Sequence, residues 1–311
     1  MSINTKDYST LKNIKKIQEK IFYEKYSTKK KELFNYVNSG GLRKKNLFKA
    51  SENNKPLVSI ITICLNSEKT LEKSIQSVLN QSYDNIEYLI IDGCSTDKSL
   101  EIINSYGNFI DLWISQKDDG IYDAMNKGIL LSSGKIIGIL NADDEYTKDA
   151  VKLAKEYFST KKIDFLFGSV KKDRLLSGFH QKKINWKFNI YPAHSSGFFI
   201  TQKAQLISGL YDQNFPLHAD YDLIFRLIKK FQLNGIAMNR EHVTGIFNEM
   251  GKSSQESKLN YFFEEFKIRK KNNQNIFFIS LLFLIKIIYL KLFKIPYFKK
   301  FFHKLRKLIN Y

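Results

Sequence analysis

The sequence of 311 residues has little cysteine, and its most apolar segment is short. Its two cysteines, Cys64 and Cys94, imply no disulfide framework, and the reducing cytosol is the default compartment for such a chain. The first 30 residues contain no apolar core typical of a signal peptide. Near the C-terminus, residues 276–285 run without a charge, whereas a membrane-spanning helix needs about 20 apolar residues. We therefore expect a cytoplasmic protein.

Acidic residues are absent from 267–311, which carry 12 Lys and Arg. Residues 1–55 are also basic, with a net charge of +9, whereas residues 56–266 have a net charge of −2. Two basic ends fit an anionic membrane surface or a nucleic acid. Because the middle is near-neutral and its acids are clustered, we expect a membrane surface and no nucleic acid.

Strand and helix patterns alternate between residue 58 and about residue 160. Apolar runs typical of buried strands occur at 58–64, 88–91, 109–114 and 136–140. Helical spacing of apolar residues follows these runs at 67–80, 97–105, 122–131 and 148–159. This order predicts an α/β protein with a mostly parallel sheet and helices on both faces. Ligands of such sheets bind beyond the carboxyl ends of the strands.

The flanking segments have other patterns. Residues 9–37 show helical spacing, and the basic segment 42–55 has the composition of a linker. After residue 160 we expect strands at 164–170, 196–201 and 242–247, and an amphipathic helix at 221–231. In the apolar helix expected from residue 276, a polar stripe falls within an arc of roughly 140°. A lysine stripe opposite a broad apolar face is typical of a helix lying in a membrane interface; the stripe consists of Ser280, Lys286, Lys291 and Lys294.

Two polar clusters follow predicted strands. In the segment Asp92–Asp97, a carboxylate at a strand end can accept hydrogen bonds from a base or a ribose, although a plain turn with a helix cap fits equally well. The segment Asn141–Asp144 contains two adjacent carboxylates, which repel each other unless a cation joins them. A hard divalent ion that also binds substrate phosphates would offset that repulsion. The alternative is a solvated acidic turn.

Two further clusters open predicted helices. In the segment 118–128, Asn126 or Lys127 could reach a phosphate or a base, and Asp119 could cap the helix. In the segment 218–222, Asp220 and Asp222 point to different faces of the helix. One of these two carboxylates could therefore cap the helix while the other faces a cleft.

Five motifs in order resemble glycosyltransferase family 2, which has the GT-A fold, particularly its branch in bacterial capsule, O-antigen and exopolysaccharide synthesis. The resemblance covers about 56–250. The motifs are VSIITICLN (58–66), IDGCSTDKS (91–99), DGIYDAMNKGI (119–129), GILNADDEY (138–146) and HADYDLIFRL (218–227).

The resemblance implies a site for a nucleotide-sugar donor, with Asp92 as the contact to the base. The residues that it places around the nucleotide-sugar are Thr62, Asn66, Asp92, Ser95, Asp119, Asn126, Asn141 and Ala142.

The resemblance also implies a metal site and a catalytic base. Asp143 and Asp144 would hold Mn²⁺ or Mg²⁺, since Asn141 stands where the family's D-x-D motif usually has its first Asp. Asp220 matches the catalytic base, and Ala219 stands where the family often has Glu. His194 and His218 fall in segments expected on the acceptor side.

The predicted chain therefore has a basic helical extension at 1–55, a catalytic domain at 56–250 and basic membrane-associating helices at 251–311. Its expected function is the inverting transfer of a sugar from a UDP-linked donor to a lipid-linked or growing surface glycan at the inner face of the cell membrane. A homo-oligomer is possible through the N-terminal helix. The alternatives are a nucleotidyltransferase acting on a sugar phosphate, which would favour a glycine-rich phosphate loop after residue 64, and a catalytically silent scaffold.

Overall fold

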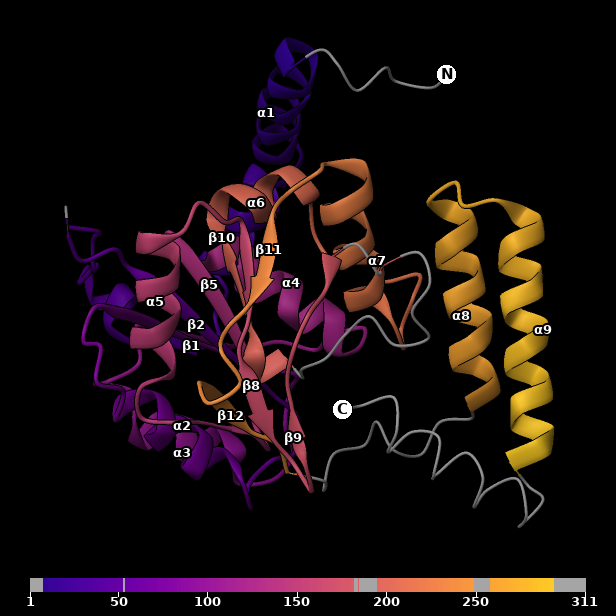
Figure 1. Cartoon of the computed structure of the whole chain (residues 1–311). Coiled ribbons are helices and arrows are strands. Elements are labelled where there is room, and N and C mark those ends of the chain that lie inside the picture. The colour runs from indigo at the N-terminus through magenta and orange to yellow at the C-terminus, as the bar shows by residue number, and fades with distance from the viewer. Residues whose placement is uncertain (1–7, 53, 182–183, 185–194, 249–257, 294–311) are drawn as a thin grey trace. The chain divides into compact units, whose positions relative to one another are not determined.

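A computed structural model describes residues 8–52, 54–181, 184, 195–248 and 258–293, with side chains from residue 18 (Figure 1). The chain forms two compact units, Met1–Gly251 and Lys252–Tyr311. Each unit is described by itself.

The first unit contains an eight-stranded sheet in the order β1-β4-β3-β2-β5-β10-β7-β11. Strands β2 to β5 are parallel to one another, whereas β10 runs antiparallel to both β5 and β7. The sheet is therefore mostly parallel, as predicted. Its strands are β1 (Ser39–Gly40), β2 (Val58–Cys64), β3 (Ile86–Asp92), β4 (Leu112–Ser115), β5 (Ile136–Asn141), β7 (Phe165–Phe167), β10 (Phe198–Thr201) and β11 (Gly235–Ala237).

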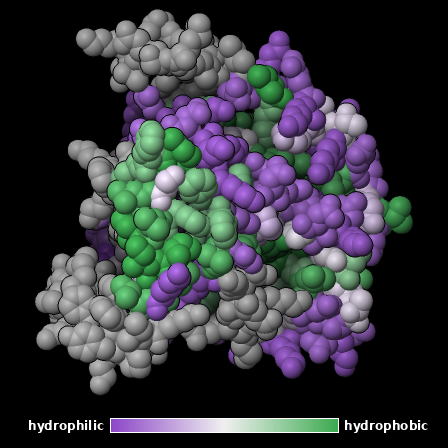
Figure 2. Space-filling model, turned by 90° about the vertical axis from the view of Figure 1, so that its right-hand side faces the viewer, coloured by the Kyte–Doolittle hydropathy of each residue, from purple (hydrophilic) through white to green (hydrophobic). Residues whose placement is uncertain are grey.

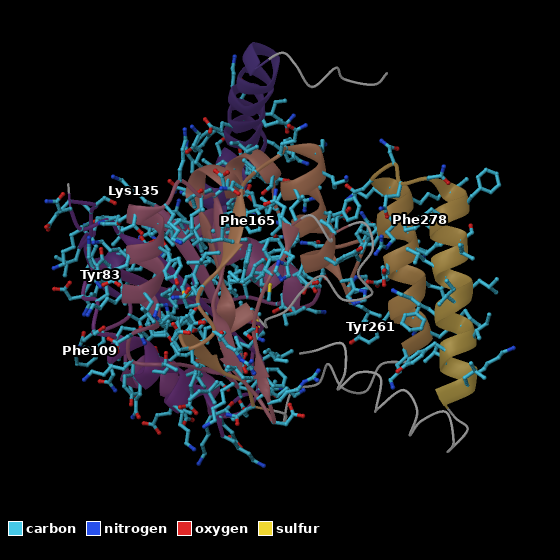
Figure 3. The ribbon with its side chains drawn as sticks, viewed as in Figure 1. Tyr83, Phe109, Lys135, Phe165, Tyr261 and Phe278 are labelled. Atoms are coloured by element: carbon cyan, nitrogen blue, oxygen red, sulfur yellow. The ribbon has the colours of Figure 1, made fainter. Side chains whose placement is uncertain are left out.

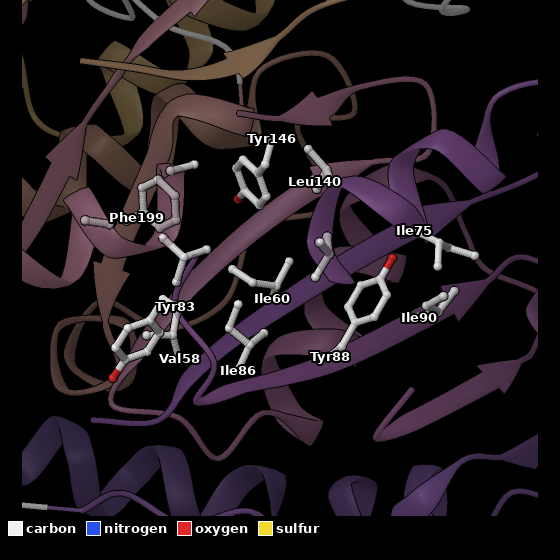
Figure 4. Packing of buried hydrophobic residues seen from close by; sticks show 14 of the residues in the cluster. Val58, Ile60, Ile75, Tyr83, Ile86, Tyr88, Ile90, Leu140, Tyr146 and Phe199 are labelled. Carbon is white, nitrogen blue, oxygen red and sulfur yellow. The ribbon is translucent and has the colours of Figure 1, made fainter. Parts of the chain in front are cut away.

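Helices cover both faces of this sheet. Strand residues such as Ile60 pack in one core with apolar residues of α2, α3 and α5, and Figure 4 shows part of that core. On the other face α4 lies against β2, where a Cβ at Gly128 would come within 2.3 Å of Ile61. The helix α1 packs on α4 and α6. The helices are α1 (Tyr8–Phe34), α2 (Leu71–Leu79), α3 (Ser99–Ser105), α4 (Ile121–Leu131), α5 (Ala150–Thr160), α6 (Gln202–Ser208) and α7 (Ala219–Phe225), which continues into a π-helical turn.

The segment after α1 is part of the folded unit and not the linker that its composition suggests. Gly40 pairs with Trp113 at the edge of the sheet, where a Cβ would meet the indole at 2.7 Å. Arg43 follows in a short 3₁₀ helix and is buried; its guanidinium donates to the carbonyl of Leu131 and lies 3.3 Å from the carboxylate of Glu87. The buried ion pair between Arg43 and Glu87 fixes the backbone of the segment in which Arg43 lies.

A second sheet, in the order β6-β12-β8-β9, lies in the same unit. The single strand predicted at 164–170 is divided at Gly168, so that β7 joins the large sheet and β8 the small one. A Cβ at Gly168 would meet Thr244 at 2.3 Å, and glycine thus permits the close crossing. The strands are β6 (Glu145–Tyr146), β8 (Ser169–Lys171), β9 (Leu175–Leu176) and β12 (Val243–Ile246).

The second unit is a hairpin of α8 (Lys258–Lys271) and α9 (Ile276–Phe293). The ring of Phe283 packs against those of Phe263 and Phe266, with centroids 5.0 and 5.5 Å away. Among the described residues, no helix has the length and apolarity that crossing a membrane requires. The predicted polar stripe is wrong in one member, because Lys286 turns inward and pairs with Glu265 of α8.

Candidate active site at the carboxyl ends of the strands

The carboxyl ends of four parallel strands carry the predicted polar residues to one edge of the sheet. In the strand register Cys64 is opposite Asp92, Asp92 is opposite Ser115, and Ile63 is opposite Asn141. Because the strands run in the same direction, the loops that follow them converge. The sheet therefore gathers the segments that the sequence marks as candidates for donor binding.

Asp92 is fully buried at the end of β3. One carboxylate oxygen accepts from the Ser115 hydroxyl at 2.6 Å and from the Ser95 backbone N–H at 3.1 Å, and the other accepts from the Ser95 hydroxyl at 2.5 Å. These bonds fix the turn through Cys94, which has a φ of 64°. Asp92 and Ser95 thus belong to one hydrogen-bond network, which determines the shape of the loop that follows β3.

Asn66 connects this loop with the one that follows β2. Its side-chain oxygen accepts from the Thr96 backbone N–H at 2.8 Å, and its own N–H donates to the Ser95 hydroxyl at 2.8 Å. Thr62 lies deeper; it is fully buried, and its hydroxyl is 3.0 Å from that of Tyr88. Thr62 thus supports the site from within the core, and Asn66 is at its surface.

Asp118, for which the sequence suggested no role, lies against the residue that follows β3. A Cβ at Gly93 would lie 2.4 Å from a carboxylate oxygen of Asp118. Desolvation raises the pKa of the Asp118 carboxyl, and the charges of Asp123 and Asp92 add to the effect. The neighbouring Asp119 is exposed. The geometry therefore favours Asp118 over Asp119 as the acid that faces the strand ends. The sequence signal for this arrangement was Gly93, which has no side chain and leaves room for the Asp118 carboxylate.

The polar residues of α4 connect loops. The Asn126 amide donates to the carbonyl of Tyr211 at 2.9 Å and accepts from its N–H at 2.8 Å. The Lys127 ammonium lies 3.2 Å from the Asp123 carboxylate and donates to the carbonyl of Lys117 at 2.7 Å. The resemblance places Asn126 at the nucleotide, whereas in the structure both polar groups of its amide are engaged by the backbone of Tyr211. We assign Asn126 to holding that loop.

Tyr122, at the start of α4, contacts the candidate base. Its hydroxyl donates to the Asp220 carboxylate at 3.2 Å, and its ring lies 5.3 Å from that of Tyr211. Sequence reasoning missed Tyr122 because its partner is 98 residues away. The motif tyrosine thus connects α4 to α7.

The two carboxylates of α7 are in different surroundings. Asp222 is fully buried and pairs with Arg226 at 2.8 Å, whose guanidinium also donates to the carbonyl of Leu210. Asp220 is partly exposed. Asp222 is therefore structural, and Asp220 is the carboxylate that a substrate can reach. His218 immediately precedes α7 and is partly exposed, whereas His194 lies outside the described residues.

The segment after β5 contains the candidate metal ligands. Asp144 is fully buried and accepts from the Asn248 backbone N–H at 3.3 Å and from the Asn141 amide at 3.4 Å. Ala142 is buried and donates its N–H to the carbonyl of Ile63. Asp143 is partly exposed and is the more accessible carboxylate.

Within the described part of the chain, no group of three or more His, Cys, Asp and Glu residues could by itself hold a metal ion. An accessible carboxylate beside an amide is still a suitable oxygen donor set for Mg²⁺ or Mn²⁺ when diphosphate oxygens supply further ligands. These residues thus fit an ion that binds together with a phosphorylated donor.

Comparison with known proteins identifies the family. The model "Glycosyl transferase family 2" matches residues 59–210. An uncharacterized glycosyltransferase of Mycobacterium tuberculosis is 31% identical over 221 residues, which cover 63% of this chain and 83% of that protein. The chain belongs to glycosyltransferase family 2. It is therefore a glycosyltransferase and not a nucleotidyltransferase.

One further relative and two solved structures are similar to this glycosyltransferase. The hyaluronan synthase of Pasteurella multocida is 30% identical over 201 residues, covering 60% of this chain and 21% of the synthase. The crystal structure of S. aureus TarS 1–349 with UDP superimposes with a TM-score of 0.56 at 14% identity, covering 71% of this chain and 67% of TarS. The mannosyltransferase PcManGT from Pyrobaculum calidifontis, in complex with GDP-Man and Mn²⁺, gives 0.55 at 12% identity, covering 84% and 75%. The fold is GT-A, as predicted.

Proposed function

We propose that this glycosyltransferase transfers a sugar, with inversion at the anomeric carbon, from a UDP-sugar to a hydroxyl of a lipid-linked or growing surface glycan. The observation that carries the proposal is the hydrogen bond from Tyr122 to Asp220. It connects the helix that follows the β4 loop with the partly exposed carboxylate that we take as the general base.

Asp220 acts as the general base in this proposal. It takes the proton of the acceptor hydroxyl, whose oxygen attacks the anomeric carbon and forms the new glycosidic bond. The bond from that carbon to the diphosphate breaks at the same time, and the diphosphate leaves with the electron pair. In-line attack by a deprotonated hydroxyl inverts the configuration. Tyr122 holds the carboxylate through its hydroxyl, and Asp222 pairs with Arg226 and holds the helix in place.

The donor binds at the strand ends. Asp118 contacts the nucleotide, and the network of Asp92 and Ser95 sets the shape of the loop below it. The complex of TarS with UDP, a structural neighbour, supports a uridine nucleotide. Asp143 would hold Mn²⁺ or Mg²⁺, and the ion would stabilise the charge that develops on the leaving diphosphate. The Mn²⁺ complex of PcManGT supports the ion.

The acceptor is proposed to be a surface glycan made at the inner face of the membrane. The name of the hyaluronan synthase, a relative that makes a polysaccharide, supports the glycan. The 12 basic and no acidic residues of 267–311 support an anionic membrane nearby. We retain His218 as an acceptor-side candidate because it immediately precedes the helix of Asp220. A homo-oligomer through α1 stays a prediction.

A panel of nucleotide sugars with Mn²⁺ present tests the donor, and NMR of the product tests inversion. We expect turnover of a UDP-sugar and an inverted anomeric centre. Asp220→Asn should lower kcat by about 10²–10⁴-fold and leave UDP binding unchanged. Asp173→Asn removes an exposed carboxylate between β8 and β9 and is the matched control. Near-normal turnover by Asp220→Asn, or retention of configuration, would refute the mechanism.

A further inference from the structure

The outward face of α9 is apolar between Phe277 and Ile288. With successive residues 100° apart, five of the six exposed large apolar residues of α9 fall within an arc of about 100°, and Ile276 at the start of the helix lies outside it. Figure 2 looks onto the side of Figure 1 that carries α9, and hydrophobic residues gather there in one area. The members of this face, called the α9 apolar face below, are Phe277, Leu281, Leu284, Ile285 and Ile288.

The opposite side of α9 is fixed against α8. Ile279 is buried there, and Phe283 packs between Phe263 and Phe266. Lys286 is 4% exposed, and its ammonium pairs with Glu265. The side chain of Lys286 therefore points into the hairpin and adds no charge to the outer face of α9.

A charged pair inside an apolar hairpin determines which face of α9 turns inward. The Glu265 carboxylate also accepts from Arg269 at 2.9 Å, so that the ammonium of Lys286 and the guanidinium of Arg269 share it. Rotating α9 about its axis would bring Lys286 out of reach of its partner and leave the carboxylate with fewer partners. The pair therefore keeps the α9 apolar face directed away from α8.

We infer that the α9 apolar face is the surface by which this chain enters the interface of an anionic lipid bilayer. Charge complementarity selects this partner, since 267–311 carry 12 basic and no acidic residues. A helix with exposed Phe, Leu and Ile beside basic residues lies in the headgroup region and does not cross the bilayer. The inference deepens the membrane location proposed above and is independent of the transfer chemistry.

Flotation of the full chain with vesicles tests the inference without substrates. Phosphatidylglycerol–phosphatidylcholine vesicles are compared with pure phosphatidylcholine vesicles, and we expect binding to the former that weakens in high salt. Phe277→Glu is the main variant because this side chain is 83% exposed and not part of the hairpin core. We expect its vesicle partition coefficient to fall on the order of tenfold.

Phe109→Glu makes the same chemical change at a side chain that is 61% exposed in the first unit, labelled in Figure 3, and should bind vesicles as the unchanged chain does. Equal flotation of Phe277→Glu and Phe109→Glu would overturn the inference, as would equal binding to both kinds of vesicle. Loss of self-association without loss of flotation would show that a second copy covers the face. Transfer to a water-soluble acceptor should survive in Phe277→Glu, so that a failed catalytic proposal is told apart from a failed membrane surface.

Discussion

Replacing Asn126 with alanine tests whether its side chain stabilises the fold or contacts the nucleotide. The side chain is 2% exposed and bonds both the N–H and the C=O of Tyr211, at 2.8 and 2.9 Å. Alanine leaves these two backbone groups without their partner. Each such group costs about 1–3 kcal/mol, so we expect a loss of about 2–6 kcal/mol in the free energy of unfolding.

Urea unfolding and UDP titration measure the two effects separately. A loss of this size is a large part of the ordinary stability of a domain, about 5–15 kcal/mol, and should shift the unfolding midpoint clearly. UDP affinity should stay within about twofold, because the amide does not face the donor. Asn126→Asp keeps the acceptor but sets a carboxylate against the Tyr211 carbonyl, and should unfold as easily as the alanine variant. Asn104→Ala changes an exposed Asn of α3 and is the control.

The opposite pattern would refute the reasoning. Unchanged stability with an affinity for UDP lowered by about tenfold or more would show that Asn126 contacts the nucleotide. The two hydrogen bonds from Asn126 to the backbone of Tyr211 would then not explain why this asparagine is part of the motif.

Three further predictions concern the site. Tyr122→Phe should lower kcat by about tenfold, with the KM of the donor unchanged, because it removes the hydroxyl that holds the Asp220 carboxylate; a normal kcat would contradict this. The raised pKa of the Asp118 carboxyl stabilises the fold at acid pH, and this contribution is lost as the pH rises from the ordinary aspartate value through the raised folded value. Asp118→Asn should therefore make Tm depend less on pH between those two pKa values. An unchanged slope of Tm against pH would show that the Asp118 carboxyl is not its source. Asp143→Asn should raise the Mn²⁺ concentration needed for half-maximal turnover without changing Tm. Asp144→Asn should lower Tm, because this carboxylate is buried and hydrogen-bonded. The reverse result would show that Asp144 is the metal ligand and Asp143 the structural residue.

The parallel half of the sheet could be predicted from the sequence because its strands are buried on both faces. Apolar runs therefore mark them directly, and β2 begins and ends at the predicted residues. Short strands such as β11, with three residues, carry too little pattern of their own and form only by pairing with β7. The turn at Gly168 likewise depends on Thr244, 76 residues later in the chain, and local sequence cannot show it.

The place of the site was predictable, but the direction of its side chains was not. Parallel strands bring their carboxyl ends together, and the polar residues after them follow. Whether Asp118 or its neighbour Asp119 turns inward depends on the space that Gly93 leaves open in the loop after β3. Whether an amide is free for a ligand depends on partners such as Tyr211, which is 85 residues from Asn126.

The helix α4 connects the two halves of the proposed reaction. Lys127 holds the loop that leads to Asp118, Asn126 holds the loop of Tyr211, and Tyr122 holds Asp220. These contacts start within two turns of one helix, and their spacing is therefore fixed by helical geometry. A shift of the donor loop must then move the carboxylate that takes the acceptor proton, unless α4 itself deforms. The spacing that matters for catalysis in this chain is thus internal to α4, and a residue inserted between Tyr122 and Asn126 should lower donor affinity and kcat together.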